Sequence, residues 1–340
     1  MILKLVQLGK THSEEISHLA ELTKSLVPVV PVNQNPQKTF SLHGMVKPHS
    51  NAFFVKREAS MNLCLAFRSE PLFTLIHGPR RSRKSSLLHE IIGRLDFSSF
   101  VYAKVDTISS SIKTDDALWE QFGKILSGSE SPASPEVRKA AKKWAALLVN
   151  SRPPLLLHLF NQDYSLNGQK RKLIVFWDEY DAMYKHHELR RGAATALRDV
   201  RNIVDRNRES LPSFGGLVCL GAYLARMVID PSSSSPYFDV VRDHHVLDFT
   251  LDETTALLQQ YQSFKKVEVS PEVAASIQEL TGGHCGLVSV CGRFMQDKGG
   301  NFDLQSWKDS IPDVITSSIS KRTTPASKMN YSVRKDVASR

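Results

Sequence analysis

Residues 77–88 read HGPRRSRKSSLL, and they directly follow the apolar run LFTLIH at residues 72–77. The phosphate-loop pattern is G-x-x-x-x-G-K-[ST], placed between a strand and a helix. The apolar run predicts a buried strand, and the amphipathic sequence at residues 85–95 predicts a helix. The sequence therefore favours a phosphate loop at this position, with a basic surface turn as the alternative.

Each residue type in this loop suits a bound phosphate. Backbone amides of the loop and of the helix N-terminus would wrap the β-phosphate. Lys84 would reach the β- and γ-phosphates as a point charge, and Ser85 would coordinate Mg²⁺. The residues expected at the nucleotide are Gly78, Pro79, Arg80, Arg81, Ser82, Arg83, Lys84, Ser85 and Ser86.

One position departs from the pattern, because Arg83 stands where the second glycine is expected. Glycine there permits a close approach and a backbone geometry that a side chain hinders. If the position requires a positive φ, an arginine costs about 1–2 kcal/mol. We expect nucleotide binding to tolerate this cost and turnover to be slow.

A second apolar run ends in two acids, since residues 173–179 read LIVFWDE. We expect Asp178 to orient Mg²⁺ and Glu179 to accept a proton from the attacking water. An acidic turn after a strand is the alternative. Both this pair and the loop follow predicted strands, where ligands bind in open α/β sheets, so together they predict a site for ATP and Mg²⁺.

The pattern of apolar residues indicates an α/β protein. Strands are predicted at residues 72–77, 100–105, 172–177 and 216–221, and helices at 13–26, 61–68, 85–95, 115–126, 137–149 and 188–207. Apolar strands alternating with helices indicate a parallel sheet covered on both faces. After it the pattern becomes helical. We expect an N-terminal helix and linker at 1–51, a core at 52–248, a helical lid at 249–315 and a basic, disordered tail at 316–340.

Composition and charge limit the other functions that the sequence allows. The 340 residues carry a formal charge of +9, of which residues 321–340 contribute more than half, with six basic residues and one acidic residue. Binding of nucleic acid through this tail stays an alternative to a solvated, disordered segment. No apolar run is long enough for a membrane span, and no signal peptide is evident. The cysteines show no metal spacing, and Cys64 and Cys219 are expected to be buried thiols.

Seven segments in order resemble the AAA+/STAND-like ATPases related to archaeal and origin-recognition ATPases. The segments are FFVKRE (53–58), HGPRRSRKSSLL (77–88), LIVFWDEYD (173–181), GLVCLGAY (216–223), SPYFDVV (235–241), FTLDETTALLQQY (249–261) and TGGHCGLVSVCGRF (281–294). The resemblance covers roughly residues 52–310. Within this group the chain looks similar to the ATPase modules of fungal and oomycete Crinkler-type proteins.

The resemblance implies further roles. Phe54 and Arg57 match an entry segment that packs near the adenine, and the turn ending at Gly283 and His284 matches a lid motif that faces the nucleotide. His284 would contact nucleotide or cap the following helix. Cys285 replaces the proline usual in this motif. At the end of the fourth strand, where the family has a polar sensor, this chain has Gly-Ala-Tyr at 221–223.

Three functions follow as hypotheses. The first is an intracellular ATPase, cytoplasmic or nuclear, in which slow Mg²⁺-dependent hydrolysis drives a conformational switch. The second is a catalytically decayed, Crinkler-like effector or interaction module, for which secretion is implied by the resemblance only. The third is nucleic-acid contact through basic residues. A protein partner or a homo-oligomer fits the first two hypotheses, and a membrane fits none.

Overall fold

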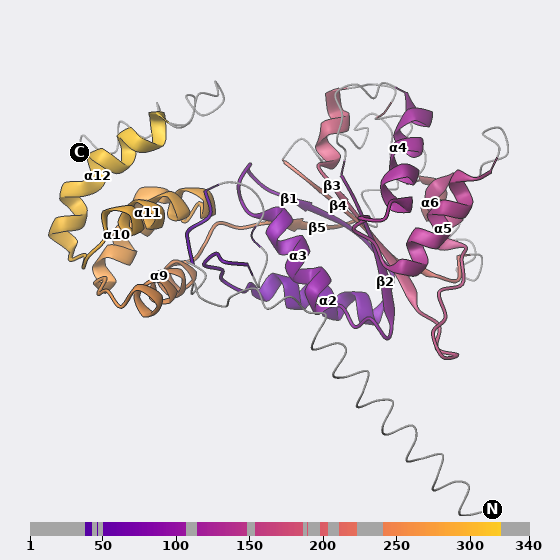
Figure 1. Cartoon of the computed structure of the whole chain (residues 1–340), viewed down its shortest axis with the longest axis horizontal. Coiled ribbons are helices and arrows are strands. Elements are labelled where there is room, and N and C mark those ends of the chain that lie inside the picture. The colour runs from indigo at the N-terminus through magenta and orange to yellow at the C-terminus, as the bar shows by residue number, and fades with distance from the viewer. Residues whose placement is uncertain are drawn as a thin grey trace, which may run out of the picture. The chain divides into compact units, whose positions relative to one another are not determined.

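A computed structural model shows one five-stranded sheet with the strand order β2-β3-β4-β1-β5, covered by helices (Figure 1). The structure describes residues 38–42, 46, 50–106, 114–147, 154–185, 189, 198–202, 211–222 and 241–320. The predicted helix at 13–26 and most of the one at 188–207 lie outside these residues. None of the helices described is long and apolar enough to cross a membrane.

All neighbouring strands of the sheet are parallel. The strands are β1 Leu72–His77, β2 Phe100–Asp106, β3 Lys172–Asp178, β4 Phe214–Gly221 and β5 Val241–His245. The four predicted strands are confirmed. The fifth strand, β5, was not predicted, because it lies at the edge of the sheet and its sequence VRDHH is polar and half exposed. Because the strands are parallel, their carboxyl ends share one edge.

Helices cover both faces of the sheet, as the apolar strands predicted. The helices around the sheet are α2 Glu58–Ser69, α3 Lys84–Arg94, α4 Asp115–Ser127, α5 Pro135–Ala145 and α6 Leu155–Phe160, with the 3-10 helix η2 at Tyr180–Lys185. Successive strand residues point to opposite faces. Leu75 accordingly joins the cluster formed with α4, α5 and α6, and Ile76 joins the cluster formed with α2 and α3.

The C-terminal region is helical, as the pattern predicted. Its helices are α9 Leu251–Lys265, α10 Pro271–Thr281, α11 Cys285–Lys298 and α12 Leu304–Ser320. They share a hydrophobic cluster that also contains Phe40 and Phe53, and we call these four helices the lid. A Cβ at Gly292 would lie 2.3 Å from the Phe40 ring, so α11 needs glycine at this contact. The described residues from Thr39 onward belong to one compact unit.

Candidate functional site

The predicted phosphate loop, Gly78–Arg83, links interior strand β1 to helix α3. Space around Gly78 is limited, since a Cβ there would lie 3.1 Å from Ser82 Oγ. The first hydrogen bond of α3 runs from the Leu87 amide to the Arg83 carbonyl, at 2.9 Å. The first three amides of α3 therefore have no acceptor within the helix. A helix N-terminus of this kind is a suitable site for an anion.

Two arginines in the loop have left-handed backbone. Arg81 has a φ of 65°, and Arg83, the N-cap of α3, has φ 64° and ψ 31°. Arg83 therefore has the positive φ that strains a residue with a side chain, at a cost of about 1–2 kcal/mol. The Arg83 side chain leaves the loop, and its Nη2 donates a hydrogen bond to Ser289 Oγ on α11 at 2.6 Å. Its guanidinium carbon lies 6.0 Å from the centre of the Phe249 ring.

Lys84 lies in the loop with its amine turned toward backbone carbonyls. The Nζ atom donates to Gly78 O at 3.1 Å and to Pro79 O at 2.8 Å. Burial lowers the pKa of Lys84, while the nearby carboxylates of Asp181 and Asp178 raise it. To contact a phosphate, the amine must exchange these two carbonyl acceptors for phosphate oxygens.

The predicted Mg²⁺ ligands Ser85 and Asp178 lie together, although they come from distant parts of the sequence. The Ser85 hydroxyl lies close enough to the Asp178 carboxylate to lower its pKa, and this carboxylate is buried at the end of β3. Burial raises the pKa of Asp178, and the Ser85 hydroxyl and Lys104 oppose this rise. Lys104 Nζ lies 3.9 Å from Asp178 Oδ2 and 2.5 Å from Asp106 Oδ1.

Glu179 follows at once, with a left-handed φ of 52° and an exposed side chain. Its backbone amide donates to Asp178 Oδ1 at 3.0 Å. Partial desolvation of the carboxyl group raises the pKa of Glu179, and the carboxylates of Asp178, Asp106 and Asp181 raise it further, whereas Lys104 lowers it. A raised pKa brings a carboxyl group closer to the range that suits a general base.

Three charged residues of this edge, Lys104, Asp106 and Asp181, were not predicted from the sequence. Asp106 on β2 pairs in register with Asp178 on β3, and Asp181 lies in η2. A signal was available for Asp106, because it follows a predicted strand, as Asp178 does. Lys104 and Asp106 are two residues apart on β2 and so share a face, but nothing in the sequence indicated that Lys104 would also lie near Asp178 on the next strand.

The donor set at this edge fits Mg²⁺ bound together with phosphate. Within the described ranges, no group of three or more His, Cys, Asp or Glu side chains could hold a metal ion by itself. Mg²⁺ prefers oxygen ligands and is commonly held by one or two protein groups with substrate phosphates and water. The Ser85 hydroxyl and the Asp178 carboxylate are oxygen donors of this kind, and they lie near each other.

A cleft lies beside α3 and contains about 250 Å³ of unfilled space, part of it open to solvent. Its lining consists of Phe54, Val55, Arg57, Arg83, Ser86, Leu87, Glu90 and Phe249. The two entry-segment residues implied by the resemblance, Phe54 and Arg57, are therefore in its wall. Ser86, in the first turn of α3, is also in the wall, so the cleft continues from the phosphate loop.

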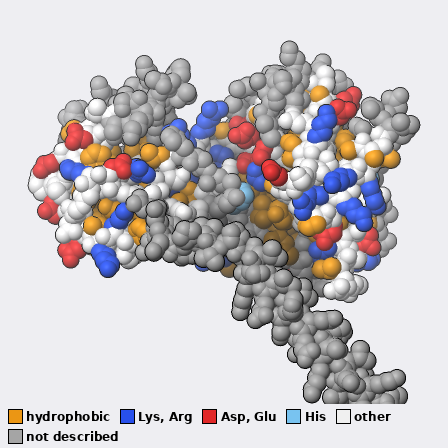
Figure 2. Space-filling model, viewed as in Figure 1, with side chains coloured by type: hydrophobic (Ala, Val, Ile, Leu, Met, Phe, Trp, Pro, Cys, Tyr) orange, Lys and Arg blue, Asp and Glu red, His pale blue; other side chains and the backbone are white. Residues whose placement is uncertain are grey.

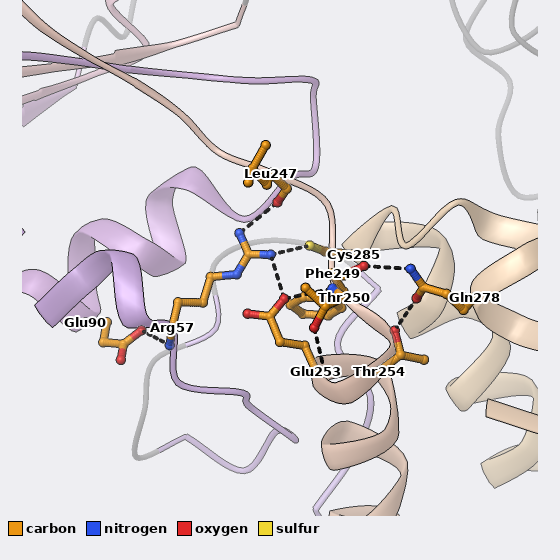
Figure 3. A network of polar contacts seen from close by, with 9 residues as sticks. All are labelled: Arg57, Glu90, Leu247, Phe249, Thr250, Glu253, Thr254, Gln278 and Cys285. Carbon is orange, nitrogen blue, oxygen red and sulfur yellow. Dashed lines mark hydrogen bonds and ion pairs between the residues drawn. The ribbon is translucent and has the colours of Figure 1, made fainter. Parts of the chain in front are cut away.

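Arg57 connects the entry segment to the core and to the lid (Figure 3). Its amide donates to Glu90 Oε2 at 3.3 Å, and its Nη1 donates to Leu247 O at 2.9 Å. Its Nη2 lies 3.5 Å from Glu253 Oε2 and 3.8 Å from Cys285 Sγ. The guanidinium also lies 5.0 Å from the centre of the Phe249 ring. The backbone and side chain of Arg57 together therefore contact three segments that are far apart in the sequence.

The predicted lid turn contacts the phosphate loop. Gly283 has a φ of 75°, and a Cβ there would lie 2.1 Å from Phe249 O, so the turn requires glycine. His284 caps α11, since its Nδ1 accepts a hydrogen bond from the Leu287 amide at 3.4 Å. The capping alternative for His284 is thus confirmed. Its Nε2 lies 3.1 Å from Arg80 O in the phosphate loop.

Basic residues outside the loop do not form a patch of one sign on the face shown in Figure 2. Lys and Arg side chains lie over the part of the molecule that carries α4 and α5, with acidic and hydrophobic side chains among them. Helix α5 contributes Arg138, Lys139, Lys142 and Lys143. The predicted basic tail lies outside the described residues. All four cysteines are free and buried, which confirms the expectation for Cys64 and Cys219.

Comparison with known proteins identifies the fold. No family model and no curated protein matches the sequence. Among solved structures, the chain is similar to a Walker-type ATPase of Pyrococcus abyssi, with a TM-score of 0.56, 16% identity and coverage of 87% of this chain and 79% of that chain. It is also similar to the ORC2 protein of Aeropyrum pernix in its ADPNP-ADP complexes, with a TM-score of 0.51, 13% identity and coverage of 76% and 68%. The chain therefore shares the parallel α/β fold of P-loop ATPases.

Proposed function

We propose that this protein binds ATP with Mg²⁺ at the phosphate loop and hydrolyses it slowly, as a conformational switch. The observation that carries the proposal is the proximity of the Ser85 hydroxyl to the Asp178 carboxylate, whose pKa it lowers. These two oxygen donors are suited to Mg²⁺, and Ser85 directly follows Lys84 at the N-terminus of α3. A hydroxyl, a carboxylate, an amine and free helix amides at one edge of a parallel sheet match the needs of a nucleoside triphosphate.

Each group would act as its chemistry allows. Lys84 would leave the carbonyls of Gly78 and Pro79 and donate to the phosphates. Mg²⁺, when bound, would offset phosphate charge and hold the phosphate chain in position. Ser85 and Asp178 would hold the metal. Glu179 would take the proton of the attacking water, a role that suits its raised pKa.

The base would enter the cleft between the entry segment and the lid. The cleft contains Phe54, Arg57 and Phe249 in its wall, but it is too narrow in this conformation to hold a nucleotide base. Binding would therefore displace the entry segment or the lid. This displacement, sensitive to the γ-phosphate, is the switch that we propose. The division into a core at 52–248 and a lid at 249–315 belongs to the same proposal.

Calorimetric titration of Mg²⁺-ATP and Mg²⁺-ADP tests the site. We expect saturable binding by the wild-type protein, loss of tight binding in Lys84→Ala, and retention in Lys124→Ala. Lys124 is a suitable control because its side chain is 78% exposed on α4. Absence of binding to either nucleotide by folded wild-type protein would reject the proposal.

Two features favour a second function, a decayed site in a Crinkler-like interaction module. Arg83 has a strained backbone in the loop, and the Lys84 amine is bonded to loop carbonyls. Such a module would bind nucleotide without turnover, or not at all, and would act through a protein partner in the cytoplasm or nucleus. Mg²⁺-dependent phosphate release that disappears in Lys84→Ala would exclude this function.

A further inference from the structure

The first turns of α11 lie against the phosphate loop through three contacts. The imidazole of His284 accepts from the Leu287 amide at Nδ1, so its Nε2 carries the proton that is donated to Arg80 O. A Cβ at Gly286 would lie 3.1 Å from Arg81 Cβ, which shows how closely the helix approaches the loop. The third contact is the hydrogen bond between the Arg83 guanidinium and the Ser289 hydroxyl.

The Arg83 contact is the strongest of the three by type, since its donor is charged and its donor–acceptor distance is 2.6 Å. Ser289 is fully buried, and its hydroxyl donates onward to Cys285 O at 2.8 Å. Burial lowers the pKa of Arg83, and its buried Nη1 has no hydrogen-bond partner among the described residues. The side chain therefore keeps this position despite backbone strain and incomplete pairing.

We infer that Arg83 is a positioning residue that anchors α11 to the phosphate loop. The lid would then follow the conformation of the loop through protein contacts, in addition to any contact with nucleotide. The regulatory meaning of this anchor rests on the proposed function, because only a bound phosphate would reshape the loop. When Lys84 exchanges its carbonyl acceptors for phosphate, the shift of the loop would pass through Arg83 and Ser289 to α11.

The anchor can be tested without nucleotide, through the buried thiol of Cys285 at the start of α11. A maleimide reagent reaches a buried thiol only when the surrounding structure opens, so its labelling rate reports opening of α11. Peptide-resolved mass spectrometry follows each cysteine separately. We expect Arg83→Gly to raise the labelling rate of Cys285 roughly tenfold or more, as for loss of a charge-assisted hydrogen bond. Cys219 in β4 is the internal control and should be unaffected.

Three further variants separate anchoring from general destabilisation. Ser289→Ala should raise Cys285 labelling as Arg83→Gly does, and Arg83→Lys should restore part of the protection. Asn167→Gly is the matched control, because Asn167 also has a positive φ, is exposed and lies outside both the loop and the lid, so Cys285 labelling in this variant should stay close to wild type. Unchanged Cys285 labelling in both Arg83→Gly and Ser289→Ala would overturn the anchor, and so would an equal rise at Cys219.

The outcomes also distinguish the anchor from the proposed function. If the wild-type protein binds no nucleotide but Arg83→Gly still labels Cys285 faster than wild type, the anchor stands and the ATPase proposal is rejected. If Lys84→Ala abolishes nucleotide binding but Arg83→Gly and Ser289→Ala leave Cys285 labelling unchanged, the nucleotide site is supported and the anchor is rejected. If both hold, Mg²⁺-ATP should change Cys285 labelling in the wild-type protein and much less in Arg83→Gly.

Discussion

The hydroxyl of Ser85 lies near the carboxylate of Asp178 and lowers its pKa, so the first turn of α3 meets the end of β3 at this point. The protein therefore holds the two groups near each other before any ligand arrives. A metal ion bound here would find both oxygen donors in place, so little rearrangement of the sheet edge would be needed.

Ser85→Ala should weaken the Mg²⁺ dependence of ATP binding. The variant lacks one oxygen donor, so we expect the concentration of Mg²⁺ needed for half-maximal binding to rise roughly tenfold or more. Calorimetry with ATP at a series of Mg²⁺ concentrations measures this change. Ser85→Thr keeps the hydroxyl and should behave like wild type. Equal Mg²⁺ dependence in Ser85→Ala and wild type would contradict the assignment of Ser85 as a ligand.

Glu179→Gln should bind Mg²⁺-ATP as the wild type does but release phosphate roughly 10²–10⁴ times more slowly, because an amide cannot accept the proton. Steady-state phosphate release, with binding measured in parallel, separates the two effects. Glu120→Gln is the control, since Glu120 is an exposed acid on α4. A Glu179→Gln variant that hydrolyses ATP at the wild-type rate would show that the base lies elsewhere.

Hydrolysis should rise with pH through the raised pKa of Glu179, because only the ionised carboxylate accepts a proton. The carboxylate of Asp106 raises this pKa and Lys104 lowers it. Asp106→Asn should therefore move the acidic limb of the rate profile to lower pH, and Lys104→Met should move it to higher pH. Rate profiles of the two variants are compared with that of the wild type. Shifts in the same direction would argue against Glu179 as the titrating base.

Asp178→Asn should stabilise the protein at neutral pH. Burial raises the pKa of Asp178 in the folded state above its ordinary value of 3.8. The folded state therefore favours the protonated acid, and the wild type loses this contribution to stability as pH rises through the folded-state pKa. Thermal unfolding at several pH values should show a higher Tm for the variant at neutral pH. The difference should shrink below pH 3.8. A lower Tm for the variant at neutral pH would mean that the Lys104 and Ser85 contacts outweigh burial.

Gly283→Ala should lower the free energy of unfolding more than Gly168→Ala does. Both glycines have a positive φ, of 75° and 80°, so both variants carry backbone strain. Only at Gly283 would the new Cβ meet Phe249 O, whereas nothing lies within 4 Å at Gly168. The difference in unfolding free energy between the variants isolates the steric contact. Equal losses of unfolding free energy in the two variants would show that the turn accommodates the new Cβ without a steric cost.

Local sequence patterns predicted strands β1 to β4, but they missed strand β5 and the burial of Phe40 and Val46. The strands β1 to β4 were recognised because their apolar runs reflect burial on both faces. Strand β5 was missed because its sequence VRDHH is polar and half exposed, whereas β2, at the other edge of the sheet, is apolar and mostly buried. Phe40 and Val46 are buried, although their segment was expected to be a linker or an extended arm. Their burial depends on lid helices and on α3, far along the chain.

The sequence by itself determined the parallel sheet, the loop between β1 and α3, and the acidic end of β3. These features follow from periodicity and from residue types within short windows. Only the tertiary structure decided that Ser85 lies beside Asp178, that Lys104 lies near the same carboxylate, and that Arg83 reaches Ser289. Each of these relationships joins residues from separate elements, and the direction of a long side chain depends on partners that folding brings near. The loop motif could thus be recognised from the local sequence, whereas its contact with the lid could not.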